Sequence, residues 1–142
     1  MRIALKVLIG LLIVVHLYFF TLEAILWEDW SDARHQLGFL RDDPIEVAEV
    51  AKVAKNQGVS NLFLAAALAW GLLGWSQGRP AGRPILTIFL GFIAVAGIVG
   101  YFTIKPPDPF AKAGFLVGQT VLAALALACL LIDALRHAPG DP

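Results

Sequence analysis

Charged residues are scarce in this chain, and cysteine is almost absent. Only 15% of the 142 residues are charged, whereas a soluble domain carries about 25%; 58% are hydrophobic. Eleven Lys and Arg residues balance eleven Asp and Glu residues, so we predict no basic surface for nucleic acid. The single cysteine, Cys129, lies in an apolar run. An internal disulfide and paired-thiol redox chemistry are therefore excluded within one chain.

The motifs of several enzyme classes are also missing. The sequence contains no dinucleotide- or phosphate-binding loop and no nucleophile elbow. Ligation of haem by two histidines is disfavoured because His35 and His137 lie outside the apolar segments. His16 and Glu23 could ligate a metal together with amide or water oxygens, but the expected arrangement has neither a metal nor a cofactor.

Four apolar segments are each long enough to cross a bilayer, which requires about 20 residues. The links at residues 76–83 and 105–109 are short and rich in Gly or Pro, so consecutive segments should pack antiparallel. We therefore predict an all-α polytopic membrane protein, a four-transmembrane-helix antiparallel bundle forming one domain over residues 1–142. The predicted spans are residues 3–27, 57–75, 84–103 and 110–135.

The first span is predicted to remain in the protein and to set its orientation. Its apolar run exceeds the ~7–15 residues of a signal-peptide core, and no small-x-small cleavage site follows it. Counts of Lys and Arg are nearly equal on the two sides, but Arg2 and Lys6 flank the span that usually dominates. We favour cytoplasmic N- and C-termini, with the acidic link at residues 28–55 outside.

Part of that long link is predicted to be helical. Asp43 is suited to an N-cap and Pro44 to the first position of a helix, and residues 45–54 are good helix formers. This helix is expected to run directly into the second span. Gly58 lies just beyond it, where either a neighbouring backbone passes close or the helix breaks.

Other small residues predict tight helix contacts. Gly114-x-x-x-Gly118 opens the fourth span, and Ala96-x-x-x-Gly100 lies in the third. Such spacing allows two backbones to approach closely. We interpret both as contacts within the bundle rather than as a dimer surface.

The first span contains two ionisable residues, His16 and Glu23, seven positions apart. Seven residues make about two helical turns, so both side chains should lie on one face. Ionisable groups in hydrocarbon cost a few kcal/mol or more and usually face a partner or a cavity. The pattern therefore predicts an internal polar site, with His16 and Glu23 as candidates for proton transfer.

Polar residues from the other spans are expected at the same end of the bundle. Their depth follows from the 1.5 Å rise per helical residue. With Trp27 at the end of the first span, the candidate ligand-binding residues are Asn56, Gln57, Asn61, Thr103, Gln119 and Trp27. We expect Glu23 within direct or one-water hydrogen-bonding reach of Gln57.

Each of these residues also has a structural explanation. His16 could be a core histidine bonded to a carbonyl or to Gln119, and Glu23 could be partly solvated beside Lys52 or Lys55. The amides could simply hold helices together, and Trp27 fits an interfacial aromatic belt.

Two motifs resemble a known family. They are His16-Leu17-Tyr18-Phe19-x-x-Leu22-Glu23-x-x-x-Trp27 and Asn56-Gln57-Gly58-x-x-Asn61-x-Phe63-Leu64-Ala65-Ala66. With Ala96-Gly97-Ile98-x-Gly100-x-x-Thr103 and Gln119, they make the chain similar to a small bacterial membrane family, domain of unknown function 1304. Ser60 stands where members usually have an aromatic residue. The resemblance implies a four-helix membrane fold in a bacterial cytoplasmic membrane, without an established activity.

Three functions agree with this pattern. The first is an intramembrane pocket that binds, or acts on, a small lipophilic molecule, with the amides orienting its polar group. The second is a small transport or proton-relay module that uses the same residues. The third is a structural subunit of a membrane complex. The expected partners are the lipid bilayer and a small lipophilic ligand, not nucleic acid. Whether the protein is an enzyme, and its oligomeric state, stay open.

Overall fold

The computed structural model describes residues 2–28, 44–103, 113–114 and 116–136, and every regular element in this part of the chain is helical. Two of the elements are π-helical turns. In chain order the elements are α1 (Arg2–Phe20), η1 (Thr21–Ile25), α3 (Pro44–Ser76), α4 (Gly82–Thr103), η2 (Leu116–Val121) and α6 (Leu122–Arg136). The all-α prediction is confirmed.

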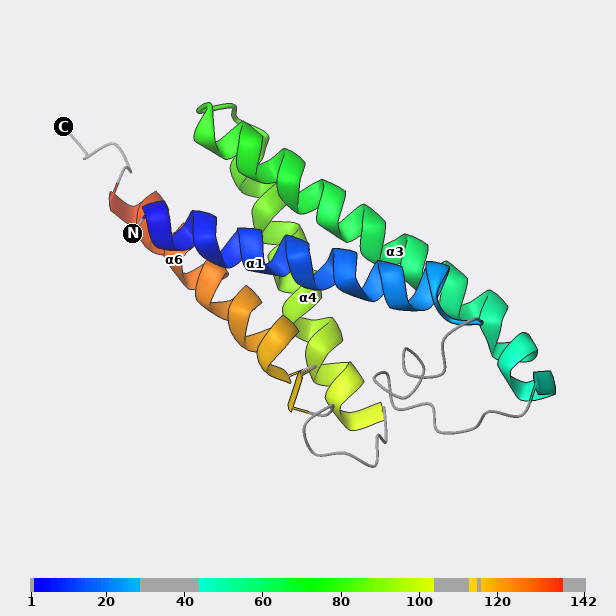
Figure 1. The fold of residues 1–142 in the computed structure, drawn as a ribbon. Helices are drawn as coiled ribbons and strands as arrows, with labels where there is room; N and C mark the ends of the chain where they lie inside the picture. Colours follow the sequence, from blue (N-terminus) through cyan, green and yellow to red (C-terminus); the bar gives the residue numbers. More distant parts are fainter. Residues whose placement is uncertain (1, 29–43, 104–112, 115, 137–142) are drawn as a thin grey trace.

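The four long helices form an antiparallel bundle (Figure 1). Both α1 and α4 pack against α3 and α6, so the helices close into a ring. Four segments are long and apolar enough to cross a membrane: Arg2–Ile25, Val47–Ser76, Gly82–Phe102 and Leu116–Arg136. The predicted four-span fold is therefore confirmed. The predicted start of the fourth span, at residue 110, lies outside the described residues.

A core of aliphatic side chains fills one end and the middle of the ring. On α1 its members are Leu5, Ile9 and Leu12, spaced so that they share one helical face. The other buried members come from α3, α4 and α6: Leu68, Leu86, Leu90, Ile93, Ala123, Ala126 and Leu130. The opposite faces expose large apolar residues such as Phe63, Trp70, Phe92 and Phe102, as expected for helices that contact lipid.

Helix α3 is longer than a membrane span requires. It begins at Pro44, as predicted, and its 33 residues correspond to about 50 Å at 1.5 Å per residue, compared with a hydrocarbon thickness of about 30 Å. The extra length packs on Trp27 in a second small core with Val47, Ala51 and Ala54. Lys55 forms an ion pair with Glu28, so it is not the partner of Glu23.

The turn between α3 and α4 is fixed by its glycines. Gly78 has a φ of +69°, and the bonds from Gly78 N to Trp75 O and from Arg79 N to Gly74 O form a Schellman cap. A side chain at Gly82 would collide with the backbone at Trp75. The turn therefore holds the start of α4 directly against the end of α3.

The predicted contact at Gly114 and Gly118 is wrong for the bundle itself. A Cβ atom added to either glycine would meet nothing within 4 Å in the described part of the chain. The close approach of α4 to η2 instead occurs at Gly97, where an added Cβ would lie 3.0 Å from both Gln119 Cβ and Thr120 N. The hydroxyl of Thr120 donates a hydrogen bond to Ala94 O at 3.1 Å and stabilises the same contact between η2 and α4.

Candidate functional site

The candidate site is centred on a chain of hydrogen bonds between α1, α3 and η1. The Nδ1–H group of His16 donates to Asn61 Oδ1 at 2.7 Å. The amide nitrogen of Asn61 donates to Glu23 Oε2, also at 2.7 Å. His16 and Glu23 therefore share one face, as predicted, but they meet through Asn61 rather than with each other.

The three hydrogen-bonded residues are buried to very different degrees. His16 is 1% exposed and Asn61 is 3% exposed, whereas Glu23 is only partly buried. With its proton on Nδ1, a neutral imidazole presents Nε2 as an acceptor, and this buried atom has no hydrogen-bond partner among the described residues. These hydrogen bonds thus connect His16, in the interior of the bundle, to the carboxyl group of Glu23 nearer the surface.

Glu23 faces a cavity of about 460 Å³ between η1, α3, α4 and η2. Its polar lining residues are Glu23, Gln57, Asn61 and Gln119. Apolar side chains form the remaining walls: Phe19, Trp27, Val50, Val53, Ala54 and Ala96, with Gly100. Ala96 and Gly100 were predicted to be contact residues, but they line this space, and their small size helps to leave it open.

Two of the polar residues that line the cavity lie in π-helical turns. Glu23 lies in η1 and Gln119 lies in η2. The bond from Leu26 N to Thr21 O spans five residues, which is the π-helical pattern. Such turns are rare and occur frequently at functional sites. Here they widen the helix at Glu23 and Gln119, which line the cavity from η1 and η2.

Each π-helical turn lies against a buried glycine of a neighbouring helix. A Cβ atom at Gly58 would lie 2.8 Å from Ala24 N and 3.2 Å from its Cα, so α3 touches the backbone of η1 there. Of the two alternatives for Gly58, close approach is therefore correct. Gly97 occupies the equivalent place against η2.

The structure brings together most, but not all, of the predicted residues. Asn56 is exposed and does not line the cavity, because it lies about 100° around the helix from Gln57. The expected amide beside Glu23 was Gln57, whereas the observed donor to Glu23 is Asn61, one turn further along α3. Gln57 is exposed and lines the cavity. The side chain of Thr103 lies outside the described residues.

Trp27 has a structural role that sequence reasoning missed. It is 5% exposed, and its indole nitrogen donates to Val47 O at 3.4 Å. It thereby fixes the start of α3 against the end of the first span while also forming a wall of the cavity. Two features of the sequence could have suggested this contact: a tryptophan at the end of a span, and a helix before the next span whose Val47, Ala51 and Ala54 share an apolar face.

Comparison with known proteins agrees with the resemblance seen in the motifs. A family model described as a protein of unknown function (DUF1304) matches residues 10–131. No curated protein and no solved structure matches the chain significantly. The matched region contains the complete His16–Asn61–Glu23 chain and every residue that lines the cavity. Because the match covers most of the sequence, the chain belongs to the DUF1304 family of proteins of unknown function.

Proposed function

We propose that the cavity beside Glu23 binds a small lipophilic molecule. The observation that carries this proposal is the combination of polar and apolar walls in one cavity of about 460 Å³. Ligand pockets typically measure ~300–1,000 Å³, and a few polar groups in them fix the orientation of a mainly apolar ligand. The polar group of the ligand would lie against Glu23, Asn61 and Gln119, and its apolar part against Phe19 and Val53.

The donor and acceptor groups indicate the chemistry of the ligand's polar group. One carboxyl and the amides of Gln57, Asn61 and Gln119 offer both donors and acceptors within one cavity. A hydroxyl or carbonyl group would fit such a lining. His16 would act behind Asn61 as a positioning residue, because its bond to Oδ1 fixes the direction in which the amide points.

The geometry favours binding over proton transfer between His16 and Glu23. The Asn61 amide stands between the imidazole and the carboxyl group, with a hydrogen bond to each. An amide does not readily take up or release a proton, so it separates the two groups as acid and base. Chemistry at this site would therefore depend on Glu23 alone, the ionisable group that lines the cavity.

Photoaffinity labelling tests the proposal directly. The probe is a long-chain alcohol that carries a diazirine and an alkyne, added to the purified full-length protein in detergent. We expect the crosslinks to map to Phe19, Val50 and Val53. Ala96→Phe should fill the cavity and reduce labelling at least fivefold, whereas Val95→Phe, at an exposed neighbouring position, should leave it unchanged.

Glu23→Gln separates binding from folding. The glutamine oxygen can still accept from Asn61, so thermal stability should stay close to that of the wild type. Loss of the carboxyl group should weaken labelling and remove any molecule that copurifies with the wild type, as detected by mass spectrometry of an organic extract. Labelling spread over the lipid-facing surface, and equal in both phenylalanine variants, would refute a ligand site.

A further inference from the structure

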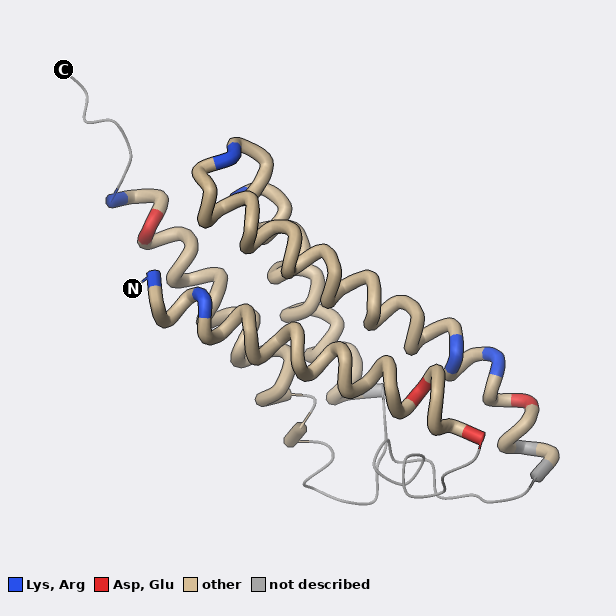
Figure 2. Tube along the Cα trace, turned by 45° about the horizontal axis from the view of Figure 1, so that its top comes forward, with Lys and Arg blue, Asp and Glu red and all other residues tan. Residues whose placement is uncertain are grey.

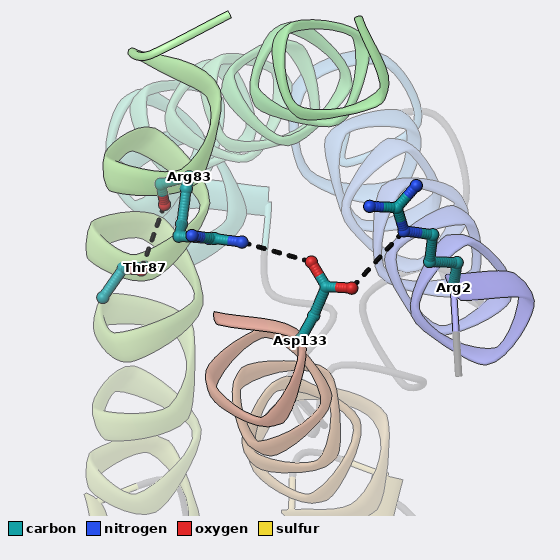
Figure 3. Close-up of polar contacts among 4 residues, drawn as sticks. All are labelled: Arg2, Arg83, Thr87 and Asp133. Carbon is teal, nitrogen blue, oxygen red and sulfur yellow. Dashed lines mark hydrogen bonds and ion pairs between the residues drawn. The ribbon is translucent and has the colours of Figure 1, made fainter. Parts of the chain in front are cut away.

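A second polar cluster lies at the opposite end of the bundle and is centred on Asp133 of α6. Asp133 is 3% exposed, and Figure 3 shows its carboxylate between two arginines of different helices. Arg2 Nε of α1 donates to Oδ1 at 3.4 Å, and Arg83 Nη2 of α4 donates to Oδ2 at 3.2 Å. Three helix ends thus meet at one buried carboxylate.

These groups line a second cavity, also of about 460 Å³. Arg2, Arg79, Arg83 and Asp133 are among its lining residues, so three arginines share the lining with one aspartate. Two positive charges of the lining are therefore not balanced within it. The Nε atom of Arg83 is buried and has no hydrogen-bond partner among the described residues.

Helix ends of both polarities surround this cavity. Helices α1 and α4 begin here at Arg2 and Gly82, whereas α3 and α6 end here at Ser76 and Arg136, so their dipoles offset one another and the excess positive charge comes from the arginine side chains. The Schellman cap at Gly78 fixes the backbone that carries Arg79. Arg2 also lies over the ring of Trp75, with its guanidinium carbon 5.7 Å from the ring centroid.

A purely structural role, in which these ion pairs hold three helices together, explains only part of this arrangement. One carboxylate bound by two arginines would hold α1, α4 and α6 together, but it does not account for Arg79 or for the open volume that the three arginines line. Guanidinium groups match phosphate oxygens with two parallel hydrogen bonds and are common in phosphate sites. Trp75 and two prolines, Pro80 and Pro84, complete the cavity with apolar surface.

We propose that this cavity binds a phosphate group, supplied either by an anionic phospholipid headgroup or by free phosphate. The cavity is at the end of the bundle where α1 and α4 start, which is the level of lipid headgroups for helices that cross a bilayer. Trp75 beside it is a residue type that concentrates at that level. The inference is independent of the ligand proposed for the cavity beside Glu23, which lies at the other end.

Two charge-matched variants test the proposal. Arg79→Gln and Arg136→Gln each remove one exposed arginine from the same end of the bundle, but only Arg79 lines the cavity. The full-length protein would be titrated with phosphatidylglycerol or phosphatidylcholine in mixed micelles and followed by native mass spectrometry. We expect Arg79→Gln to weaken phosphatidylglycerol binding about fivefold, and Arg136→Gln to change it less than twofold. Phosphatidylcholine binding should be weak in all three proteins.

Competition with inorganic phosphate identifies the source of the group. Displacement of phosphatidylglycerol at low millimolar phosphate would indicate a site for free phosphate, whereas persistence of the lipid would indicate a headgroup site; either result supports the proposal. Asp133→Asn should strengthen binding in variants that fold, because it removes the competing carboxylate. Equal effects of Arg79→Gln and Arg136→Gln, or no preference for phosphatidylglycerol over phosphatidylcholine, would overturn it.

Discussion

At the scale of single residues, Asn61 connects the two ionisable groups of the first span. It accepts a hydrogen bond from His16 and donates one to Glu23, so both ends of its amide are used. A buried polar group without partners costs free energy, and this amide supplies a partner to two such groups at once. The residue therefore joins α1 and η1 to α3 as well as lining the cavity.

Asn61→Leu should lower the stability of the purified protein in detergent. The change removes both hydrogen bonds and leaves His16 buried with neither ring nitrogen paired in the described residues. We expect a loss of roughly 0.5–2 kcal/mol, the range for polar contacts between membrane helices.

Asn56→Leu is the matched control for this measurement. Asn56 is exposed on the same helix, so its replacement should change the melting temperature little. Equal melting temperatures for the two leucine variants would show that the Asn61 bonds contribute nothing to stability.

The polar residues of the candidate site could be found from sequence because they interrupt apolar spans. His16, Asn61 and Gln119 are buried, as an isolated polar residue in a membrane helix should be. The precise partner of Glu23 could not be found, because depth was counted from a span starting at Gln57, whereas α3 begins at Pro44 and gives no fixed membrane level.

Asp133 was missed for a related reason. It stands near the end of the fourth span, where a charged residue is ordinary. The available signal was that, in the described part of the chain, its end of the bundle otherwise carries basic residues: Arg2, Lys6, Arg79, Arg83 and Arg136. Asp133, inside the last span, is a natural partner for one of them, although the sequence alone does not say for which.

At the scale of helices, the two π-helical turns and the two glycines opposite them form matched contacts. Gly58 contacts the backbone of η1 at Ala24, and Gly97 contacts η2 at Thr120. Because Glu23 and Gln119 lie in these turns, the contacts also set where the polar groups of the cavity stand.

Gly58→Ala should destabilise the protein even though alanine is the better helix former. Helix propensity favours alanine by about 1 kcal/mol. Overpacking typically costs 1–3 kcal/mol, and here the new methyl group would meet backbone atoms of Ala24, which cannot rotate away. We expect a lower melting temperature and weaker photolabelling of the cavity, since displacement of η1 moves Glu23.

The control for this substitution is Gly91→Ala in α4, where an added Cβ meets nothing within 4 Å. It should be neutral or slightly stabilising. In the double variant Gly58→Ala with Ala24→Gly, part of the lost stability should return, because one of the clashing atoms is removed. A melting temperature for Gly58→Ala equal to that for Gly91→Ala would contradict the close contact.

The long helices were predictable, but the π-helical turns were not. Apolar length alone identifies a membrane span, and Pro44 marked the start of α3. A π-helical turn changes the hydrogen-bond register without a compositional mark, so residues 21–25 and 116–121 read simply as parts of apolar helices.

At the scale of the whole molecule, charge is confined to the two ends. No charged residue occurs at positions 7–22, 56–78, 84–104 or 113–132, and Figure 2 shows the charged residues of the described chain gathered toward the ends of the bundle. This distribution leaves an uncharged middle band of the kind that a bilayer requires.

Single-cysteine labelling should place the two ends on opposite sides of the membrane. With Cys129→Ala as background, Ala48→Cys and Gln77→Cys introduce exposed positions at the start and end of α3. Gln77 is preferred to the adjacent Gly78, whose positive φ would strain a cysteine. A membrane-impermeant maleimide added to intact cells should modify Ala48→Cys only. Modification of both from outside would refute the topology, and modification of Gln77→Cys alone would reverse the predicted orientation.

The ring of helices also implies an order in which the protein assembles. The hydrogen-bonded residues His16, Asn61 and Glu23 belong to α1, α3 and η1, whereas the bond between Arg2 and Asp133 joins α1 to α6. During synthesis the N-terminal part of a chain becomes available first. The hairpin of α1 and α3 can therefore satisfy its buried polar groups before α4 is made, and the ring closes only after α6 has entered the membrane.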